Sequence, residues 1–418
     1  MRDQIIKFSD GERFPILLDD DSQPLFIPNL YLLSMCRGKS DAFNTIRKKA
    51  RAIMHLYAWG LANDIDIEFR FQKLQLLNIE EIESLHNFSR LCYKDVLKFK
   101  NTPIKSIFEN NKKNNLIKLK TNKNNFVSTE SYINTMRYIR YYLFWLADYN
   151  SVFIRDNVDK YNAYVTKKNE MLSYMMARVR SFKNKSSISY KDAFNQDVQN
   201  DIIEAINPES INNPWSIKFI KERNQIYILM SLSTGLRRGE MLKIQVQDFD
   251  PLAKTISLKR RPDDKYDTRD YEPNVKTLER VLKIEEYPCY LLVQYIKKRR
   301  KLSKSKYHPY LFVNRKGDPL SYNSAGKIYL TLRDKNSNFP ENLTQHLVRH
   351  TLNFRMSELM KSLSLSETEM NNYLKEIMGW SKNSKMPERY NQTFIRNEAN
   401  SISLLLQREI FNSGNINE

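Results

Sequence analysis

Arg237 is the first residue whose setting suggests chemistry. It lies in the sequence Ser-Thr-Gly-Leu-Arg-Arg-Gly-Glu at 233–240. The pattern predicts that one helix ends at Gly235 and that another begins with Leu236, so that Arg237 projects from a tight helix–helix junction. Glu240, three residues further on, can reach the same place and orient a guanidinium group. Taken alone, such an Arg–Glu pair is more often an ordinary surface ion pair.

A second arginine, Arg349, lies between two histidines in the sequence Thr-Gln-His-Leu-Val-Arg-His-Thr at 344–351. On a helix, His346, Arg349 and His350 share one face. The chain has only five histidines, so two in this segment are notable. A zinc site from His346 and His350 would be an alternative, but it lacks a third ligand, and the adjacent Arg349 would repel the metal. We therefore expect no metal here.

Trp380 and Tyr390 form a third element of the pattern, in Met-Gly-Trp-Ser followed by Pro-Glu-Arg-Tyr. Neither residue would be selected alone, because a tryptophan is usually a core aromatic and this chain has 24 tyrosines. Pro387, just before Tyr390, predicts a looped or kinked approach to the tyrosine.

A fourth element is the segment 254–259, which has the pattern of a strand and ends in Lys259. We expect the return strand at 269–274. Lysines on hairpins are mostly solvated, so this is the weakest of the four patterns. Lys259 is preferred to Lys265 as a functional residue because it ends the strand.

The order of the first three of these elements resembles the catalytic signature of tyrosine recombinases, the phage integrase-like enzymes. The elements TGLRRGE, HLVRHT, MGW and ERY extend from Arg237 to Tyr390 in the order of that family. One departure is that the gap from Trp380 to Tyr390 is one residue longer than expected. The resemblance implies that Arg237 and Arg349 hold the scissile phosphate of DNA and that Tyr390 is the nucleophile.

The same resemblance implies roles for five further residues. Lys259 would be the general acid on the leaving 5′ oxygen, and His346 would assist proton transfer. Trp380 occupies a position that hydrogen-bonds the phosphate in relatives. Glu240 and His350 would support the site without reacting.

The chemistry implied by the resemblance is consistent with these residue types. Attack of a phenol oxygen on a phosphodiester produces a five-coordinate, more negative state, which two fixed guanidinium groups stabilise. The ordinary pKa of tyrosine is about 10, so nearby cations and a base must favour its ionisation. The phosphotyrosyl linkage conserves bond energy, so we expect no metal, ATP or other cofactor, and no GxxxxGK[ST] nucleotide-binding loop occurs in the sequence.

The overall charge favours a nucleic-acid partner. The chain has 68 Lys+Arg against 48 Asp+Glu, a formal net charge of +20. A surplus of this size suits a phosphate backbone, although a solvated surface gives the same composition. We expect double-stranded DNA to contact a basic helix and a lysine-rich stretch through Lys48, Lys49, Arg51, Lys112 and Lys113.

The sequence divides into regions of different pattern. We expect an N-terminal arm at 1–39, either a β hairpin or irregular, and a helical DNA-binding region at 40–182. A basic insert at 98–127 interrupts this region, and a linker at 183–189 follows it. The remaining residues, 190–418, would form the catalytic domain with a tail helix at its C-terminus. The predicted fold class is mainly α, with a small antiparallel sheet packed among the helices of a mixed α/β catalytic domain.

Cellular setting and assembly follow largely from the resemblance. Three widely spaced cysteines and no apolar stretch long enough for a bilayer predict a cytoplasmic, nucleoid-associated protein without a membrane partner. Relatives act as tetramers on two DNA sites, so we expect a homo-tetramer. The apolar tail at 401–407 could pack on a neighbouring subunit or on its own domain. Two other functions share the pattern: a type IB topoisomerase, and a catalytically silent DNA-binding protein on the same fold.

Overall fold

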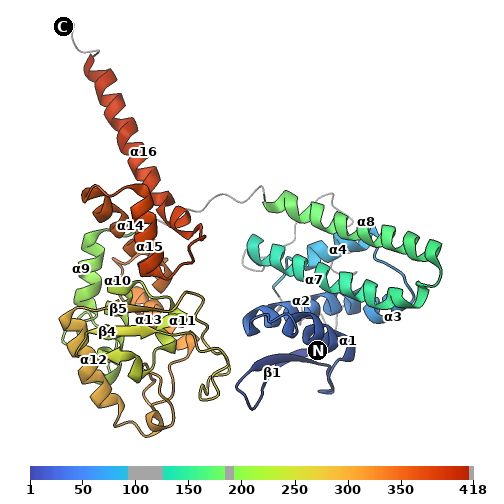
Figure 1. The fold of residues 1–418 in the computed structure, drawn as a ribbon, viewed down its shortest axis with the longest axis horizontal. Helices are drawn as coiled ribbons and strands as arrows, with labels where there is room; N and C mark the ends of the chain where they lie inside the picture. The colour runs from blue at the N-terminus through green and yellow to red at the C-terminus, as the bar shows by residue number, and fades with distance from the viewer. Residues whose placement is uncertain (93–125, 184–192, 414–418) are drawn as a thin grey trace, which may run out of the picture. The chain divides into compact units, whose positions relative to one another are not determined.

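The computed structural model describes residues 1–92, 126–183 and 193–413 (Figure 1). These residues fall into two compact units, Met1–Phe8 with Arg13–Ile188 and Ser9–Glu12 with Ser189–Glu418. Most of the basic insert predicted at 98–127, including Lys112 and Lys113, lies outside the described residues, as does nearly all of the linker. Where the chain is described, no helix combines the length and the apolar character that a bilayer crossing requires.

The first unit begins with a hairpin. Strands β1 (Arg2–Lys7) and β2 (Arg13–Leu18) pair antiparallel, with Arg2 opposite Leu18. The chain then turns into α1 (Phe26–Tyr31) and the π-helix η1 (Leu32–Arg37). The arm expected at 1–39 is therefore partly helical, which the hairpin-or-irregular prediction did not include.

Asn29 explains why the N-terminal residues form part of the first unit. Its amide accepts a hydrogen bond from Leu17 N–H at 2.8 Å and donates to the carbonyls of Leu17 at 2.8 Å and Leu25 at 2.7 Å. The side chain is buried, and it ties β2 to the residues just before α1 through hydrogen bonds to both backbone groups of Leu17. Tyr31 and Leu32 then join the hydrophobic core of this unit.

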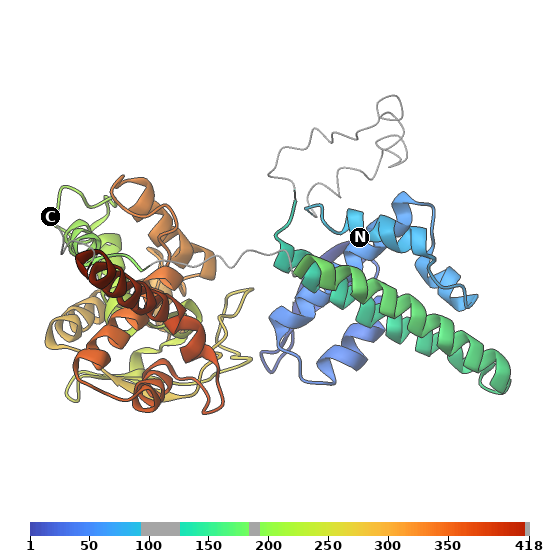
Figure 2. The same ribbon diagram turned by 90° about the horizontal axis from the view of Figure 1, so that it is seen from above.

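Helices form the rest of the first unit. They are α2 (Phe43–Ala62), α3 (Ile67–Gln72), α4 (Ile79–Phe88), α7 (Thr129–Ser151), the 3₁₀ turn η4 (Val152–Ile154) and α8 (Val158–Lys183). The helical region predicted at 40–182 is thus present in the described residues. Figures 1 and 2 show α7 and α8 running side by side. The core includes Trp59, Phe71, Ile139, Tyr142 and Leu143.

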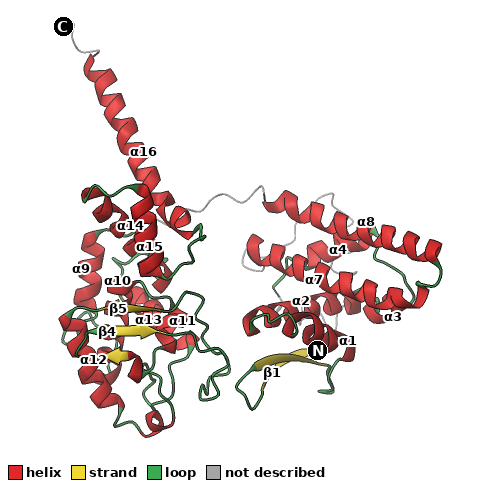
Figure 3. Ribbon diagram, viewed as in Figure 1, coloured by secondary structure: helices red, strands yellow, loops and turns green. Residues whose placement is uncertain are grey.

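The second unit surrounds a small sheet with helices (Figure 3). The sheet has the antiparallel order β3 (Phe249–Asp250), β4 (Thr255–Leu258) and β5 (Arg280–Lys283). The helices are α9 (Gln196–Ala205), α10 (Lys218–Thr234), α11 (Arg238–Lys243), α12 (Glu286–Arg299), α13 (Tyr322–Asp334), α14 (Gln345–Ser362), α15 (Glu367–Met378) and α16 (Met386–Ser413), with 3₁₀ turns η5 (Val246–Asp248) and η6 (Ser303–Tyr307). The mainly helical fold class with a small antiparallel sheet is confirmed.

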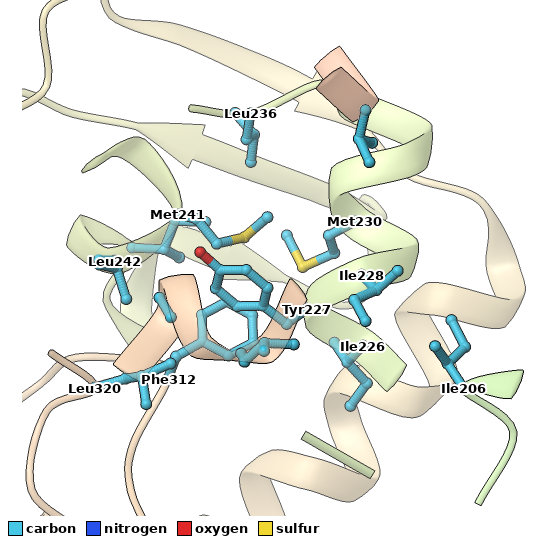
Figure 4. Packing of buried hydrophobic residues seen from close by; sticks show 14 of the residues in the cluster. Ile206, Ile226, Tyr227, Ile228, Met230, Leu236, Met241, Leu242, Phe312 and Leu320 are labelled. Carbon is cyan, nitrogen blue, oxygen red and sulfur yellow. The ribbon is translucent and has the colours of Figure 1, made fainter. Parts of the chain in front are cut away.

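The core of this unit lies between α10 and its neighbours. Figure 4 shows Tyr227 and Met230 of α10 facing Met241 of α11 and Phe312. The rings of Tyr227 and Phe312 meet edge to face, with centroids 5.1 Å apart. This buried cluster fixes α10 and α11 relative to each other, and with them the junction that carries Arg237.

The predicted return strand at 269–274 is wrong. Strand β4 pairs instead with β5, so that Ser257 lies opposite Val281. Residues between the two strands form a long connection that is anchored by charge. The Arg269 guanidinium pairs with the buried carboxylate of Asp267 at 2.7 Å and donates to the carbonyls of Leu242 and Leu320, each at 3.1 Å. These side-chain contacts hold the segment in place without the hydrogen bonds of a β-strand.

Candidate active site

The helix–helix junction predicted around Arg237 is present. Helix α10 ends at Thr234, and Gly235 takes a left-handed conformation with φ 61°. A Cβ at Gly235 would lie 2.9 Å from Leu352 Cδ2 and 3.3 Å from Met378 Cε, so both the backbone angle and the space favour glycine. Leu236 is fully buried, and Arg237 precedes the first residue of α11.

Two residues of α14 hold this junction from the opposite side. Gln345 donates to the carbonyl of Leu236 at 2.8 Å and accepts a hydrogen bond from Tyr227 at 2.8 Å. One turn later, Arg349 Nη1 donates to the carbonyl of Gly235 at 2.6 Å. Residues four apart face the same way on a helix, so α14 binds two successive carbonyls of the junction.

Arg349 is almost completely buried, with 1% of its surface exposed. Besides the Gly235 contact, its Nη2 donates to the carbonyl of Met378 at 3.3 Å, at the end of α15. Its guanidinium carbon lies 5.5 Å from the centroid of the Trp380 ring. The guanidinium is therefore fixed between the ends of α10 and α15.

Trp380 reaches Arg349 because α15 ends with a second left-handed glycine, Gly379 at φ 65°. The backbone N–H of Trp380 donates to the carbonyl of Lys375 at 2.8 Å, and the carbonyl of Gly379 accepts from the backbone N–H of Leu278 at 2.9 Å. Only 6% of the Trp380 surface is exposed. Its position is thus set by the helix end and by the residues just before β5.

Glu240 is the centre of the charge network. Its side chain is buried and accepts from Arg237 N–H at 2.5 Å, from the Thr277 hydroxyl and from Arg280 Nη1 at 2.8 Å. Arg349 Nη1 lies 3.8 Å away. Burial alone would raise the pKa of Glu240, but the charges of Arg280 and Arg349, with the hydrogen bonds from Thr277 and Arg237, lower it below its ordinary value. The predicted orienting role therefore has two guanidinium groups to act on, those of Arg280 and Arg349.

Arg237 itself keeps unused hydrogen-bonding capacity. Its side chain is half-buried, and its Nη1 is enclosed without a hydrogen-bond partner among the described residues. A buried charged donor without a partner is costly, and an anion bound here would remove that cost.

The two histidines of α14 differ in exposure. His346 is exposed on the first turn of the helix, whereas His350 is buried beside Arg349. The predicted helix face is present, and it places His346 at the surface near the buried arginine. Thr344 begins the helix by accepting a hydrogen bond from Leu347 N–H at 3.3 Å.

Lys259 follows β4 directly and is exposed. It lines a small hollow together with Glu240, Lys243 and Ser257, so that it borders the same network. Lys265 lies further along the connection, with its ammonium 5.0 Å from the centroid of the Tyr266 ring. Of the two lysines, Lys259 is the one that lines this hollow with Glu240.

Tyr390 belongs to α16, but its side chain lies outside those that the structure describes. The looped approach predicted from Pro387 is wrong. Helix α16 begins at Met386, so Pro387 occupies the first turn, where a missing N–H costs little and the fixed φ suits a helix.

Arg280 and Thr277 were missed by the sequence reasoning. The Arg280 side chain, 4% exposed, pairs with Glu240, and its Nε donates to the carbonyl of Ile377 at 2.9 Å. It thus links β5, Glu240 and the helix that leads to Trp380. No spacing distinguished Arg280 from other basic residues, because the return strand had been expected elsewhere. Gln345 was also missed, although it lies within a segment already selected.

Of the basic residues predicted to contact DNA in the first unit, Lys48 and Arg51 are exposed on α2. Lys49 is different, because its ammonium pairs with Asp41 at 2.6 Å and lies 3.6 Å from Cys36 Sγ. Arg51 lies 3.5 Å from Asp3. The ammonium group of Lys49 is therefore paired within the first unit, and we do not retain Lys49 as a DNA contact.

Comparison with known families decides the nature of the second unit. Residues 194–395 match the phage integrase family. These residues form an integrase domain. The predicted resemblance to tyrosine recombinases is thereby confirmed for this part of the chain, and the members of this family are enzymes that cleave and rejoin DNA strands. The matched range includes Arg237, Arg349 and Tyr390.

The solved structures that are similar to the chain include integrases and recombinases. One is the Tn1549 transposon integrase in complex with transposon right end DNA, with 16% identity and a TM-score of 0.49, covering 91% of this chain and all of that one. Another is XerH site-specific recombinase bound to palindromic difH substrate, with 13% identity and a TM-score of 0.41, covering 91% and 94%. XerA recombinase has 13% identity and a TM-score of 0.37, covering 89% and 98%. No curated protein sequence matches the chain. The assignment of the integrase domain relies on the family match.

Proposed function

We propose that the chain is a site-specific DNA recombinase of the integrase or transposase type, which cleaves and rejoins strands through a 3′-phosphotyrosyl intermediate on Tyr390. The observation that carries the proposal is the pair of arginines at one junction. Arg349 is fixed by two backbone carbonyls, one of them that of Gly235. Arg237, two residues after Gly235, has an enclosed Nη1 with no hydrogen-bond partner in the part of the chain that the structure describes. Such a site favours a bound phosphodiester.

In the proposed cleavage step, the Tyr390 oxygen forms a bond to phosphorus and the bond from phosphorus to the 5′ oxygen breaks. Negative charge grows on the non-bridging oxygens, and the guanidinium groups of Arg237 and Arg349 stabilise it. The departing 5′ oxygen takes a proton, which we assign to Lys259. Religation reverses these steps, so the proposed cycle consumes no ATP and requires no metal ion.

Other residues support this step. His346, exposed at the start of α14, is assigned to proton transfer at the attacking oxygen. The Trp380 indole packs against Arg349 and is assigned to bind a phosphate oxygen. Glu240 and the buried His350 keep the arginine-bearing elements in place. In this scheme Glu240 acts through its contacts with Arg280 and Arg349, without touching DNA.

Contacts away from the reacting phosphate would provide affinity. We assign Lys48 and Arg51 of α2 to the phosphates of double-stranded DNA, with Lys112 and Lys113 of the basic insert. Contacts of this kind position a protein on DNA and contribute little to sequence choice. The proposed recombinase would act in the cytoplasm, on nucleoid DNA.

Assembly into a homo-tetramer on two DNA sites is part of the proposal. The first turns of α16 contact α14, and the rings of Phe394 in α16 and Phe354 in α14 are 6.2 Å apart. Figure 1 shows its later turns leaving the rest of the unit. Leu404, Leu405 and Leu406 are each more than half exposed there. A neighbouring subunit that covers these residues would remove an exposed apolar stretch.

The test is covalent capture on a nicked suicide substrate, a duplex from which the cleaved 5′ fragment diffuses away. Wild type should accumulate a protein–DNA adduct that survives denaturing electrophoresis. Tyr390→Phe should bind the same duplex but form no adduct. Tyr373→Phe is a matched control, because Tyr373 is a 48% exposed tyrosine of α15 outside the proposed site.

The outcomes separate the three functions. An equal amount of adduct from Tyr390→Phe would refute the assignment of the nucleophile. Binding without any adduct from wild type would favour a catalytically silent DNA-binding protein. Adduct formation with relaxation of supercoiled plasmid by a monomer, and no joining of two duplexes, would favour the topoisomerase alternative.

A further inference from the structure

A second basic surface lies in the integrase domain, away from the arginine pair. Residues 297–317 contain nine lysines and arginines and no aspartate or glutamate. Arg299 is buried, and the other eight are exposed. We call these eight the α12 basic surface: Lys297, Lys298, Arg300, Lys301, Lys304, Lys306, Arg315 and Lys316.

Buried contacts hold this surface in a fixed shape. The Arg299 guanidinium, 4% exposed, donates to the carbonyl of Tyr310 at 2.9 Å and to that of His308 at 2.8 Å. His308 Nε2 lies 2.7 Å from the carbonyl of Gly317, so the turn with Arg315 packs against η6. A Cβ on Gly317 would lie 2.9 Å from Ser305 N, which shows how closely the two segments meet. The cations of both segments therefore form one surface.

Most of these cations have no acidic neighbour. Lys298 pairs with Glu222 at 2.6 Å and Lys304 with Asp318 at 2.9 Å. The remaining six form no ion pair with any residue that the structure describes. Basic residues in the last turn of a helix stabilise it by interacting with the negative end of the helix dipole, which accounts for Lys297 and Lys298. The six cations of the surface from Arg300 onward lie beyond the end of α12, so helix stability does not explain them.

The surface is separate from the proposed active site. Lys298 pairs with Glu222 near the start of α10, whereas Arg349 binds the carbonyl of Gly235 just after its end. Glu222 and Gly235 are 13 residues apart, which corresponds to about 20 Å along a helix. Figure 1 likewise shows α12 and α15 in different parts of the second unit.

We propose that the α12 basic surface binds the phosphate backbone of double-stranded DNA outside the segment held at the active site. This contact is additional to strand cleavage and does not depend on it. The charge suits a polyanion, and the apolar residues of the same segments, Leu311, Phe312 and Val313, are buried. A membrane surface would need exposed apolar side chains to insert. Single strands would need several aromatic rings to stack on, whereas among residues 297–317 Tyr307 is the exposed large ring.

The experiment measures the affinity of the full chain for fluorescent 20- and 60-base-pair duplexes between 50 and 200 mM KCl. The test variant is Arg300→Glu with Arg315→Glu. The control is Lys283→Glu with Lys335→Glu, two exposed lysines of the same unit outside the surface, with the same change of net charge. Circular dichroism melting should show that both variants fold.

Each phosphate contact gives a slope of about −0.9 in log affinity against log salt, so losing two contacts reduces the slope by about 1.8. Over this fourfold salt range, the affinity of wild type for the 60-base-pair duplex should fall about 12-fold more than that of the test variant. The control should keep the wild-type slope. Adduct formation on a short suicide substrate should be unchanged in the test variant.

Equal salt slopes for the test variant and the control would overturn the proposal, because net charge alone would then explain the binding. Tighter binding of wild type to phosphatidylglycerol vesicles or to single-stranded RNA than to the 60-base-pair duplex would also overturn it. If wild type formed no adduct but the salt slopes were as predicted, the proposed function would be refuted and the proposal for the α12 basic surface would still hold.

Discussion

Replacing Glu240 by glutamine tests the charge network most directly. The amide keeps the size of the side chain and its oxygen can still accept from Arg237 N–H. It removes the negative charge that faces Arg280 at 2.8 Å and Arg349 at 3.8 Å. Both guanidinium groups are buried, so they would be left without a countercharge in a medium of low polarity.

The expected loss can be worked out from these contacts. Removing one partner of a buried ion pair costs about 3–5 kcal/mol. The Gly235 and Met378 carbonyls still bind Arg349, and the Ile377 carbonyl still binds Arg280, so we expect the lower end, about 3 kcal/mol. For a unit of this size that corresponds to a fall in melting temperature of about 6–12 °C.

The assay is scanning calorimetry of wild type, Glu240→Gln and a surface control. Glu286→Gln is the control, because Glu286 forms an exposed ion pair with Lys254 and should lose less than about 1 kcal/mol. The same three proteins are tested for adduct formation, where Glu240→Gln should slow the reaction and Glu286→Gln should not.

The pH dependence provides an independent check. The pKa of Glu240 is lowered in the folded protein from an ordinary value of 4.5. A carboxylate of this kind contributes stability that is fully present above the unfolded pKa and is lost as pH falls through the folded pKa. The difference in free energy of unfolding between wild type and Glu240→Gln should therefore be largest at pH 7 and become smaller below about pH 4.5. A gap that is the same at pH 7 and pH 3.5, or a loss no larger than that of Glu286→Gln, would refute the reasoning.

Three further predictions concern single positions. Gly239→Ala should strongly destabilise the second unit, because a Cβ there would lie 2.3 Å from the carbonyl oxygen of Asn274; an unchanged calorimetric transition would contradict this. Arg237→Ala should lower the rate of adduct formation at least about 100-fold while changing duplex affinity less than about 10-fold, and equal losses would instead indicate a positioning role. Lys259→Ala should be slow on a normal substrate and recover with a 5′-bridging sulfur, whose thiolate leaves without a proton. Recovery by Lys265→Ala instead would transfer the general-acid role to Lys265.

Part of this architecture follows from local sequence. The helix end at Gly235 lies where the local sequence predicted it, since apolar periodicity and capping residues fix such elements locally. Gly235 marked a helix end because its left-handed angle suits glycine. The proximity of Arg349 and Trp380 was expected only through the family resemblance, and no local pattern predicts their 5.5 Å contact.

What the sequence did not predict depends on partners far apart in the chain. Arg280 meets Glu240 forty residues away and Ile377 almost a hundred residues away, and neither contact leaves a local pattern. The position of β5 was missed because buried Asp267 and Arg269 satisfy each other, so a segment with strand-like composition forms a connection. Lys49 was expected to face DNA because its helix is basic, whereas its pairing with Asp41 depends on the turn before the helix.

The close approach of Gly235 to Leu352 has a genetic consequence. Any side chain at position 235 meets Leu352 Cδ2 first, at 2.9 Å, and this methyl group can be removed by substitution. A defect caused by Gly235→Ala should therefore have partial suppressors at position 352, such as Leu352→Ala, while the cost of the left-handed backbone remains. Among natural variants of this chain, a larger residue at 235 is expected to occur together with a smaller one at 352, although 117 positions separate them in the gene.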